Sequence, residues 1–410
     1  MSKYLANYAE KESIGLARIN QSYDYVIVVP VCNESLLCLE NIFAHVNENA
    51  LIIVVVNSPI GKDDWQKNNA LFIQGLVAKS LQETRLSPCC QLLKFKALND
   101  VLLVNKNEQG QQIHPDQGVG KARKIGCDIA LNIYISGVIK YPWIYSTDAD
   151  VILPQYYFSQ SIKNNHDFSA IVLDFEHISD DAELSKLQFL YDLKLRYYLA
   201  GITFARLDYN YIPLGSTLIV QMECYAQVRG FPMRNAGEDF YLLNKLKKIK
   251  PIKYLVDGVV VEIKSRLSDR VPFGTGPALI QIMTLASYKD YKYYHPECFI
   301  YLKKWIKFLH NTWAQGHLKI EKPSDKILSE LYAHLNCENV FKRVSTQMTS
   351  QLRWQQFIHQ WFDAFKGLKA VHFFDKKYDR LNYFELLKID SFDKVLDYPL
   401  KIFIDKYEQN

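Results

Sequence analysis

The sequence predicts an α/β protein with a mostly parallel central sheet, followed by a C-terminal helical region. Two β-branched runs, at residues 25–31 (YVIVVPV) and 51–56 (LIIVVV), are typical of strands that are covered on both faces. Helical patterns follow both runs, and strands and helices then alternate to about residue 263. Beyond residue 277 no buried strand run of this kind recurs. We therefore expect two domains, residues 1–280 and 281–410.

Composition limits the class of protein. The chain has 410 residues, of which 49% are apolar and 23% charged, as in ordinary globular proteins. A net charge of +5 is small for this length and gives no case for a nucleic-acid partner. The first 20 residues carry scattered charges, unlike a secretory signal, and no stretch is long and apolar enough to span a bilayer. The eight dispersed cysteines, with no CxxC pair, favour free thiols in a reducing, cytoplasmic setting.

The remaining elements follow in order. After the two opening strands we expect a helix at residues 63–80 and a third strand at residues 101–104. A further helix begins at Gly118. Next we expect strands at residues 143–145, 169–175, 218–220 and 259–263, and helices at residues 182–199 and 238–248. A basic, glycine-containing loop follows at residues 265–276. The C-terminal region reads as helices at residues 299–313, 326–336 and 350–365.

Two carboxylates stand at the end of the strand at residues 143–145. Asp148 and Asp150 are one residue apart, and on an extended strand both side chains would face the same way. Close like charges are unfavourable unless a cation lies between them, and a hard divalent cation suits one or two carboxylates together with substrate phosphates. We expect this pair to hold a metal ion and the metal to hold a diphosphate. A polar loop after a strand is the alternative, because DxD is a short pattern.

The segment Gly118–Val119–Gly120 opens a helix that carries Lys121, Arg123 and Lys124. The N-terminus of a helix offers free N–H groups to a phosphate. The spacing matches neither a GxxxxGK[ST] phosphate loop nor a dinucleotide fingerprint. A tight turn followed by a basic, solvated helix face therefore remains the alternative.

A second acidic pair, Glu238–Asp239, precedes a helical pattern. One interpretation is a charge-favoured helix N-terminus, and the other is a carboxylate that accepts a proton from an attacking hydroxyl. The ten histidines show no HxxxH or HExxH spacing and no GxSxG occurs, so neither a zinc enzyme nor a serine hydrolase is indicated.

In the C-terminal region the aromatic stripe Trp354, Phe357, Trp361 and Phe365 favours a core or an interface, which leaves room for an oligomer. The basic and aromatic residues 303–308 favour a solvated amphipathic helix, with peripheral membrane contact as the alternative.

Together these segments resemble the family 2-type glycosyltransferases of the GT-A fold, whose nucleotide-diphospho-sugar transferase domain is Rossmann-like. Residues 28–34 (VVPVCNE) resemble the VxPxxNE opening, and residues 118–126 resemble the G-x-x-x-ARN-x-G helix, with Lys124 where Asn is usual. Residues 146–150 resemble the DxD segment, and Gly230–Phe231–Pro232 with residues 237–243 resembles GGFP…EDxxL. The resemblance covers roughly residues 22–275 and leaves the C-terminal third unassigned.

The resemblance implies a hexosyltransferase-type enzyme that transfers a sugar from a UDP- or GDP-sugar with inversion, in the synthesis of a glycan, polysaccharide or glycolipid. It implies that Asp148 and Asp150 hold Mn²⁺ or Mg²⁺, with Asp150 the better candidate for direct ligation. Asp239 would deprotonate the acceptor hydroxyl, and Glu238 would hold the acceptor or the base. The nucleotide pocket would include the wall Pro30, Val31, Asn33 and Glu34, together with Asn57, Lys121, Arg123 and Asp148. The acceptor would be a saccharide, a lipid-linked sugar or a protein.

Two features depart from the family pattern. The second strand ends in Asn57–Ser58, where acidic residues usually contact the nucleobase, and no histidine lies between His177 and His295 to serve as a third metal ligand. Water or donor oxygens would then complete the metal shell. Alternatively, Arg266 and Arg270 of the basic loop would close over the diphosphate. A nucleotidyltransferase is one rival, but it needs a glycine-rich basic loop after the first strand, where Cys32–Asn33–Glu34–Ser35 stands. A non-catalytic carbohydrate-binding or protein-binding module is the other rival.

Overall fold

The computed structural model describes residues 1–96, 99–158, 167–314 and 316–408. The chain forms two compact units. The first comprises Met1–Ser185 and Pro213–Ala278, and the second comprises Lys186–Ile212 and Leu279–Asn410. The predicted division at residue 280 is a single cut, whereas in the structure residues 186–212 belong to the second unit.

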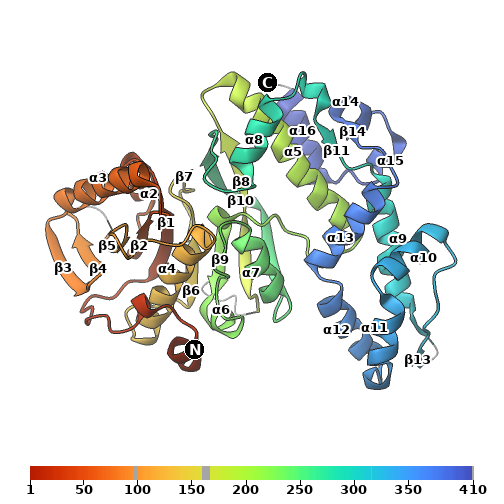
Figure 1. Cartoon of the computed structure of the whole chain (residues 1–410), viewed down its shortest axis with the longest axis horizontal. Coiled ribbons are helices and arrows are strands. Elements are labelled where there is room, and N and C mark those ends of the chain that lie inside the picture. Colours follow the sequence, from red (N-terminus) through yellow and green to blue (C-terminus); the bar gives the residue numbers. More distant parts are fainter. Residues whose placement is uncertain (97–98, 159–166, 315, 409–410) are drawn as a thin grey trace. The chain divides into compact units, whose positions relative to one another are not determined.

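The first unit contains a ten-stranded sheet in the order β3-β4-β5-β2-β1-β6-β9-β8-β10-β7 (Figure 1). Its strands are β1 (Tyr25–Val31), β2 (Ala50–Asn57), β3 (Gln82–Ser87), β4 (Cys90–Lys94), β5 (Val101–Lys106), β6 (Trp143–Ser146), β7 (Val151–Ile152), β8 (Ala170–Ile178), β9 (Leu218–Gln221) and β10 (Ile252–Lys264). The strands β5, β2, β1 and β6 pair in parallel, and so do β8 and β10. Strand β9 lies antiparallel between β6 and β8, so β8 and β10 run in the same direction as β1. The predicted α/β class with a mostly parallel central sheet is therefore confirmed.

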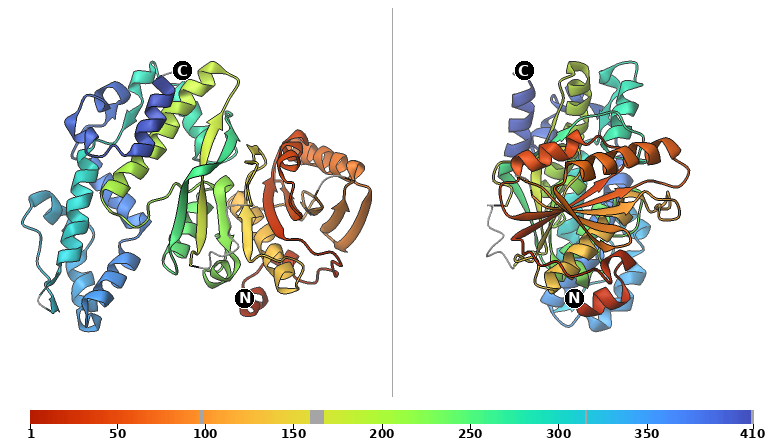
Figure 2. Two further views of the ribbon diagram at one scale, coloured as in Figure 1. Left: turned by 180° about the vertical axis from the view of Figure 1, so that it is seen from behind. Right: turned by 90° about the vertical axis from the view of Figure 1, so that its left-hand side faces the viewer.

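Helices cover the sheet on both faces. The helices of the first unit are α1 (Ser2–Asn7), α2 (Leu37–His45), α3 (Asp63–Lys79), α4 (Gly118–Ile135), α6 (Met222–Gln227) and α7 (Glu238–Lys247). Helix α4 packs against β1, β2 and β6, and α3 packs against β2. The right-hand view of Figure 2 shows α3 and α4 on opposite faces of these strands. Every residue of β1 and β2 is buried, as a β-branched run covered on both faces requires.

An antiparallel hairpin of β3 and β4, which we did not predict, lies between the second and third predicted strands. Residues 82–85 of β3 are exposed and lie at the edge of the sheet, where polar side chains meet solvent. Among the described residues all eight cysteines are free, and six of them are buried. Cys89 and Cys90 lie where β3 turns into β4, with their Sγ atoms 3.8 Å apart.

The second unit is helical. Helices α5 (Ala182–Phe204) and α8 (Thr275–Met283) each have residues in both units, and the others are α9 (Glu297–Asn311), α10 (Lys326–His334), α11 (Cys337–Val344), α12 (Gln351–Trp361), α13 (Ala364–Asp375), α14 (Tyr383–Leu386), α15 (Asp390–Asp393) and α16 (Tyr398–Glu408). Two-residue strands form two small pairs, β11 (Lys292–Tyr293) with β14 (Leu381–Asn382) and β12 (Trp313–Ala314) with β13 (His317–Leu318).

The aromatic residues of the C-terminal region form the core of this unit. Trp305 of α9 and Trp354 of α12 are fully buried, and the Trp354 indole N–H donates to the Leu309 carbonyl at 2.8 Å. Lys304 and Lys307 lie on the exposed side of α9. The structure thus shows an amphipathic helix whose aromatic side is packed inside the unit. The helix that we expected at residues 350–365 is in fact two helices, α12 and α13, because Asp363 caps a new start by accepting from the Lys366 N–H at 3.2 Å.

Candidate active site

Three parallel strands end at the same edge of the sheet and place charged side chains there. Glu34 follows β1, Asp148 and Asp150 follow β6, and Arg266 follows β10. Strands that run in one direction bring their carboxyl ends to one edge, which is where ligands bind in open α/β sheets. Residues more than 200 positions apart in the sequence therefore meet.

The short strand β7 brings Arg266 to Asp150. Val151 of β7 pairs antiparallel with Ile263 of β10, and the Lys264 N–H donates to the Asp150 carbonyl at 3.0 Å. The chain leaves β10 two residues before Arg266, beside the acidic turn. The contact between the side chains of Arg266 and Asp150 thus depends on the pairing of β7 with β10 at the edge of the sheet.

Asp148 and Asp150 lie in the turn between β6 and β7, not on an extended strand as we expected. Their side chains have different partners. Asp148 Oδ1 accepts from Arg123, whereas Asp150 Oδ2 lies 2.7 Å from Nη2 of Arg266. The premise that both carboxylates face one way on a strand is therefore wrong, and each carboxylate has its own guanidinium.

Arg123 is the buried centre of the first charge cluster, which consists of Arg123, Asp148 and Glu238. Only 2% of its side chain is exposed. Its Nε donates to Glu238 Oε1 at 2.9 Å, and its Nη1 donates to Ser146 Oγ at 2.9 Å and to the Thr147 carbonyl at 3.2 Å. The guanidinium thus joins the start of α7 to the end of β6.

Three glycines leave room for this arrangement. A Cβ on Gly215 would lie 2.2 Å from Nη2 of Arg123, so a side chain there would displace the guanidinium. A Cβ on Gly120 would lie 2.5 Å from the Pro232 carbonyl oxygen, and one on Gly126 would lie 2.4 Å from Cγ1 of Val28. The glycines of the predicted GxG helix therefore serve close packing of α4 against its neighbours.

Glu34 is the centre of the second charge cluster, which consists of Glu34, Asp150, Arg266 and Arg270. Arg266 binds Glu34 through two parallel hydrogen bonds, Nη1 to Oε2 at 2.7 Å and Nη2 to Oε1 at 2.6 Å. Arg270 also pairs with Glu34 Oε1, and its Nη1 donates to the Cys32 carbonyl at 2.9 Å. The loop after β10 is thereby fixed to the end of β1.

Burial changes the ionisation of the acidic groups at this edge. Desolvation raises the pKa of Asp150 to about 6, Arg266 opposes that rise, and Asp148 and Glu34 add to it. Desolvation also raises the pKa of Glu34, and the Arg266 guanidinium again opposes the rise. Three carboxylates close enough to perturb one another favour a bound cation.

Asp239 and Glu238 begin α7, after Gly237 in a left-handed conformation with φ of 71°. Glu238 is buried against Arg123, while Asp239 is only partly covered and accepts from the Phe240 N–H at 2.7 Å. Desolvation first, and then the neighbouring Glu238, raise the pKa of Asp239 to about 8. A carboxyl group with a pKa near the working pH is suited to proton transfer.

Asn69 of α3 ties together the ends of β1 and β2, and no sequence motif marks this residue. Its Oδ1 accepts from the Asn33 N–H at 2.8 Å, and its Nδ2 donates to the Asn57 carbonyl at 2.9 Å. Asn69 is fully buried, and Asn33 has a positive φ of 56° that Asn tolerates better than most residues. The Asn33 side chain accepts from Asn68 at 2.8 Å.

The other three predicted pocket residues are Pro30, Val31 and Lys121. Val31 is fully buried within β1, and Pro30 is buried beside it. Lys121 pairs with Glu10 of the N-terminal segment, and its Nζ lies 3.5 Å from Sδ of Met233. The structure therefore brings Arg123 to the carboxylates but not Lys121.

The oxygen atoms at this edge fit a divalent cation of the Mg²⁺ or Mn²⁺ type. Within the described ranges, no group of three His, Cys, Asp or Glu side chains is arranged to hold a metal by itself. Glu34 and Asp150 nevertheless both contact the same cationic nitrogen of Arg266. Magnesium-type ions often use one or two carboxylates and take further oxygens from water and substrate phosphates.

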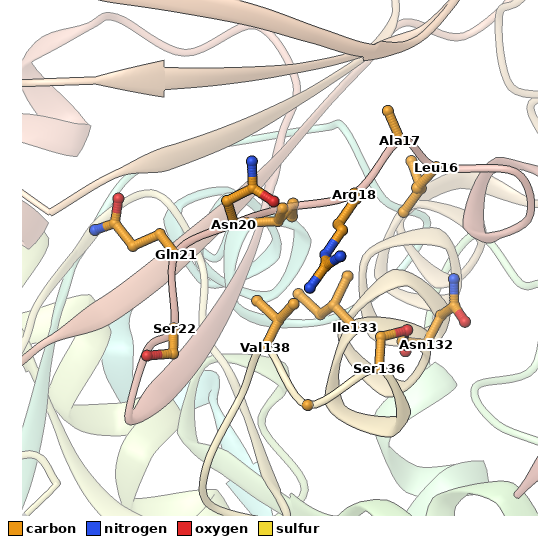
Figure 3. A pocket seen from close by; sticks show the side chains of 12 residues that line it. Leu16, Ala17, Arg18, Asn20, Gln21, Ser22, Asn132, Ile133, Ser136 and Val138 are labelled. Carbon is orange, nitrogen blue, oxygen red and sulfur yellow. Dashed lines mark hydrogen bonds between the residues drawn. The ribbon is translucent and has the colours of Figure 1, made fainter.

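A cavity beside α4 lies at the opposite end of the strands. Figure 3 shows it between the segment 16–22 and the C-terminal end of α4, with a volume of about 510 Å³. Ser22 and Val138 of its lining directly precede Tyr23 and Ile139, which form a bridge ahead of β1 and β6. None of the predicted site residues lines this cavity. In the part of the chain that the structure describes, no helix is both long and apolar enough to cross a membrane.

Comparisons with known proteins found weak structural similarities. No protein-family model and no curated protein sequence matches the chain. A solved structure of the mannosyltransferase PcManGT from Pyrobaculum calidifontis, in complex with GDP-Man and Mn²⁺, is 14% identical over 90% of this chain and 95% of its own, with a TM-score of 0.35. A mycobacterial protein is 9% identical over 59% of this chain and 65% of its own, with a TM-score of 0.30. Both TM-scores lie below 0.5, so neither structure indicates a function for this chain.

Proposed function

We propose that this chain is a glycosyltransferase that moves a sugar from a UDP- or GDP-sugar to an acceptor hydroxyl, with inversion. The observation that carries the proposal is the pair of charge clusters at the carboxyl ends of β1, β6 and β10. Glu238, Arg123 and Asp148 form one cluster, and Asp150, Glu34, Arg266 and Arg270 form the other. Such an edge offers both cation-binding oxygens and guanidinium groups for phosphates.

Asp150, with Glu34 or Asp148, would hold Mn²⁺ or Mg²⁺ in this proposal. A divalent cation bound there supplies neutralisation of the negative charge that develops on the diphosphate leaving group. Arg123 holds Asp148 in place, because the guanidinium that contacts the carboxylate is almost entirely buried. Arg266 and Arg270 supply guanidinium donors that match phosphate oxygens in geometry.

Asp239 is the proposed general base. Its side chain is partly exposed, and burial together with Glu238 raises its pKa to about 8. In the ionised form it would accept the proton of the acceptor hydroxyl while that oxygen attacks the anomeric carbon. Glu238 positions this group through its buried pairing with Arg123.

The nucleotide is expected beside the ends of β1 and β2. Asn33 and Asn57 lie there, joined by Asn69 through their backbone groups, and they carry amide side chains in place of carboxylates. Neutral donors and acceptors of this kind suit hydrogen bonds to a ribose or a base.

Calorimetry with a panel of UDP- and GDP-sugars, in the presence and absence of Mn²⁺, tests the proposal. We expect at least one donor to bind in the presence of Mn²⁺, and Asp150→Ala to lose the Mn²⁺-dependent part of the binding. A matched control is Asp180→Ala, which removes an exposed carboxylate of the same unit. Absence of donor binding across the panel, at protein concentrations that detect millimolar affinity, would reject the proposal.

A further inference from the structure

One nitrogen of Arg266 is shared between two carboxylates of the second charge cluster. Nη2 lies 2.6 Å from Glu34 Oε1 and 2.7 Å from Asp150 Oδ2. Glu34 comes from the end of β1, and Asp150 comes from the turn before β7. Oxygens from two separate segments therefore converge on a single cationic atom.

These contacts are built into the surrounding structure. Only 9% of the Glu34 side chain and 18% of the Asp150 side chain are exposed, so both carboxylates depend on a nearby positive charge. Arg270 adds a second guanidinium on Glu34 Oε1 and also donates to the Cys32 carbonyl. The position between Glu34 and Asp150 is thus one that a cation must fill.

A divalent cation and this guanidinium nitrogen cannot share the position. Oxygens bound to Mg²⁺ stand about 2.0–2.1 Å from the ion, closer than the N–O contacts of Arg266. A metal ion would therefore need the same oxygen atoms at shorter range, while the guanidinium would repel it. We propose that Arg266 occupies the cation position of the donor site and that a divalent cation binds to Glu34 and Asp150 only by displacing the Arg266 side chain.

The loop that carries Arg266 allows this exchange. About 35% of the Arg266 side chain is exposed, so its charge can move into water without being buried alone. The backbone at Ser268 packs tightly against Gly276, where a Cβ would lie 2.4 Å from the Ser268 carbonyl oxygen. The base of the loop therefore stays fixed while the long arginine side chain turns, and the displaced guanidinium becomes free for a phosphate.

Binding of Mn²⁺ without nucleotide tests the inference. The concentration of free Mn²⁺ is measured by electron paramagnetic resonance, with the full chain and at one ionic strength. We expect Arg266→Gln to bind Mn²⁺ about tenfold more tightly than the wild type, because a competing unit charge is removed. We expect Arg266→Lys, which keeps the charge, to bind within about threefold of the wild type. Arg343→Gln, an exposed change in the second unit, controls for the loss of one net charge.

Further variants identify the oxygens. Glu34→Gln or Asp150→Asn, introduced into Arg266→Gln, should abolish the gain in Mn²⁺ affinity. The inference is overturned if Arg266→Gln binds Mn²⁺ no more tightly than Arg343→Gln, or if Arg266→Lys gains as much affinity as Arg266→Gln. Thermal unfolding of each variant establishes that it is folded. If Arg266→Gln does not fold, Arg266→Ala, which also removes the charge, takes its place with the same two outcomes.

The inference rests on the proposed function for its cation site, but the two fail separately. If Arg266→Gln gains Mn²⁺ affinity but the protein binds no nucleotide sugar, the proposed glycosyltransferase function is rejected. The displacement of Arg266 by a divalent cation is then still supported. Sugar transfer by the wild type, together with no gain of Mn²⁺ affinity in Arg266→Gln, would reject the exchange alone.

Discussion

Replacing Arg123 with methionine tests the buried charge cluster most severely. Methionine keeps much of the chain length but removes the guanidinium from Glu238, whose side chain is 5% exposed. Breaking a buried ion pair by removing one partner costs roughly 3–5 kcal/mol, because a charge is left in a poorly solvated place. Asp148 is 35% exposed and can be solvated, so its share of the loss should be about 1 kcal/mol or less. We expect the first unit to lose roughly 3–5 kcal/mol of unfolding free energy.

The loss should grow with pH. Desolvation already raises the pKa of Glu238, and Arg123 opposes that rise, so the variant raises the pKa further. A carboxyl group with a higher pKa in the folded state than in the unfolded state retains its proton at low pH. Its contribution to stability is therefore lost as pH rises through the folded-state pKa. The variant should be closer to the wild type at pH 5.5 than at pH 8.

Hydrogen exchange of the amides in β1 and β6 measures this free energy within the first unit, because both strands adjoin the cluster. Arg343→Met, at an exposed position on α11, is the matched control and should leave these amides unchanged. A loss below about 1 kcal/mol would place Arg123 among ordinary surface positions and refute the reasoning. A loss that is equal at both pH values would refute the assignment of the cost to Glu238.

Sugar transfer should rise with pH through about 8, since the Asp239 base must be ionised, and Asp239→Asn should lower the rate by about 100-fold or more; a flat pH–rate profile would contradict this. Gly215→Ala places a Cβ 2.2 Å from Nη2 of Arg123 and should cost about 1–3 kcal/mol in a urea titration, so wild-type stability would argue against the packing. Asn69→Leu leaves backbone groups at the ends of β1 and β2 unpaired and should cost about 1–3 kcal/mol, measured by thermal unfolding beside the exposed control Asn47→Leu.

The fold could be predicted where the sequence pattern and the environment agree. The runs at residues 25–31 and 51–56 are buried on both faces, and a β-branched run has few other stable environments. The β3–β4 hairpin escaped prediction because an exposed edge strand carries polar residues like those of a loop. The break between α12 and α13 escaped because the aromatic pattern continues across it, although Asp363 was a readable helix-start signal.

The candidate site could be predicted in part. The resemblance to the glycosyltransferase family led us to expect Glu34 and Asp148 in one nucleotide pocket, with Asp150 as a metal ligand beside it. The sequence does not show which arginine meets which carboxylate. The contact of Arg266 with Asp150 arises from the pairing of β7 with β10, and a two-residue strand has too few residues to show a pattern. The pairing of Lys121 with Glu10 likewise depends on the path of the N-terminal segment.

Release of nucleoside diphosphate from UDP- and GDP-sugars, by the wild type and by Asp150→Ala, tests the proposed function most directly. The assay is run with Mn²⁺ and again with EDTA, and with a panel of saccharide and lipid-linked acceptors. We expect the wild type to release UDP or GDP from at least one donor in the presence of Mn²⁺. Release should be lost in Asp150→Ala and in EDTA. Turnover by Asp150→Ala that persists in EDTA would contradict the assignment of this edge of the sheet as a metal-dependent sugar-transfer site.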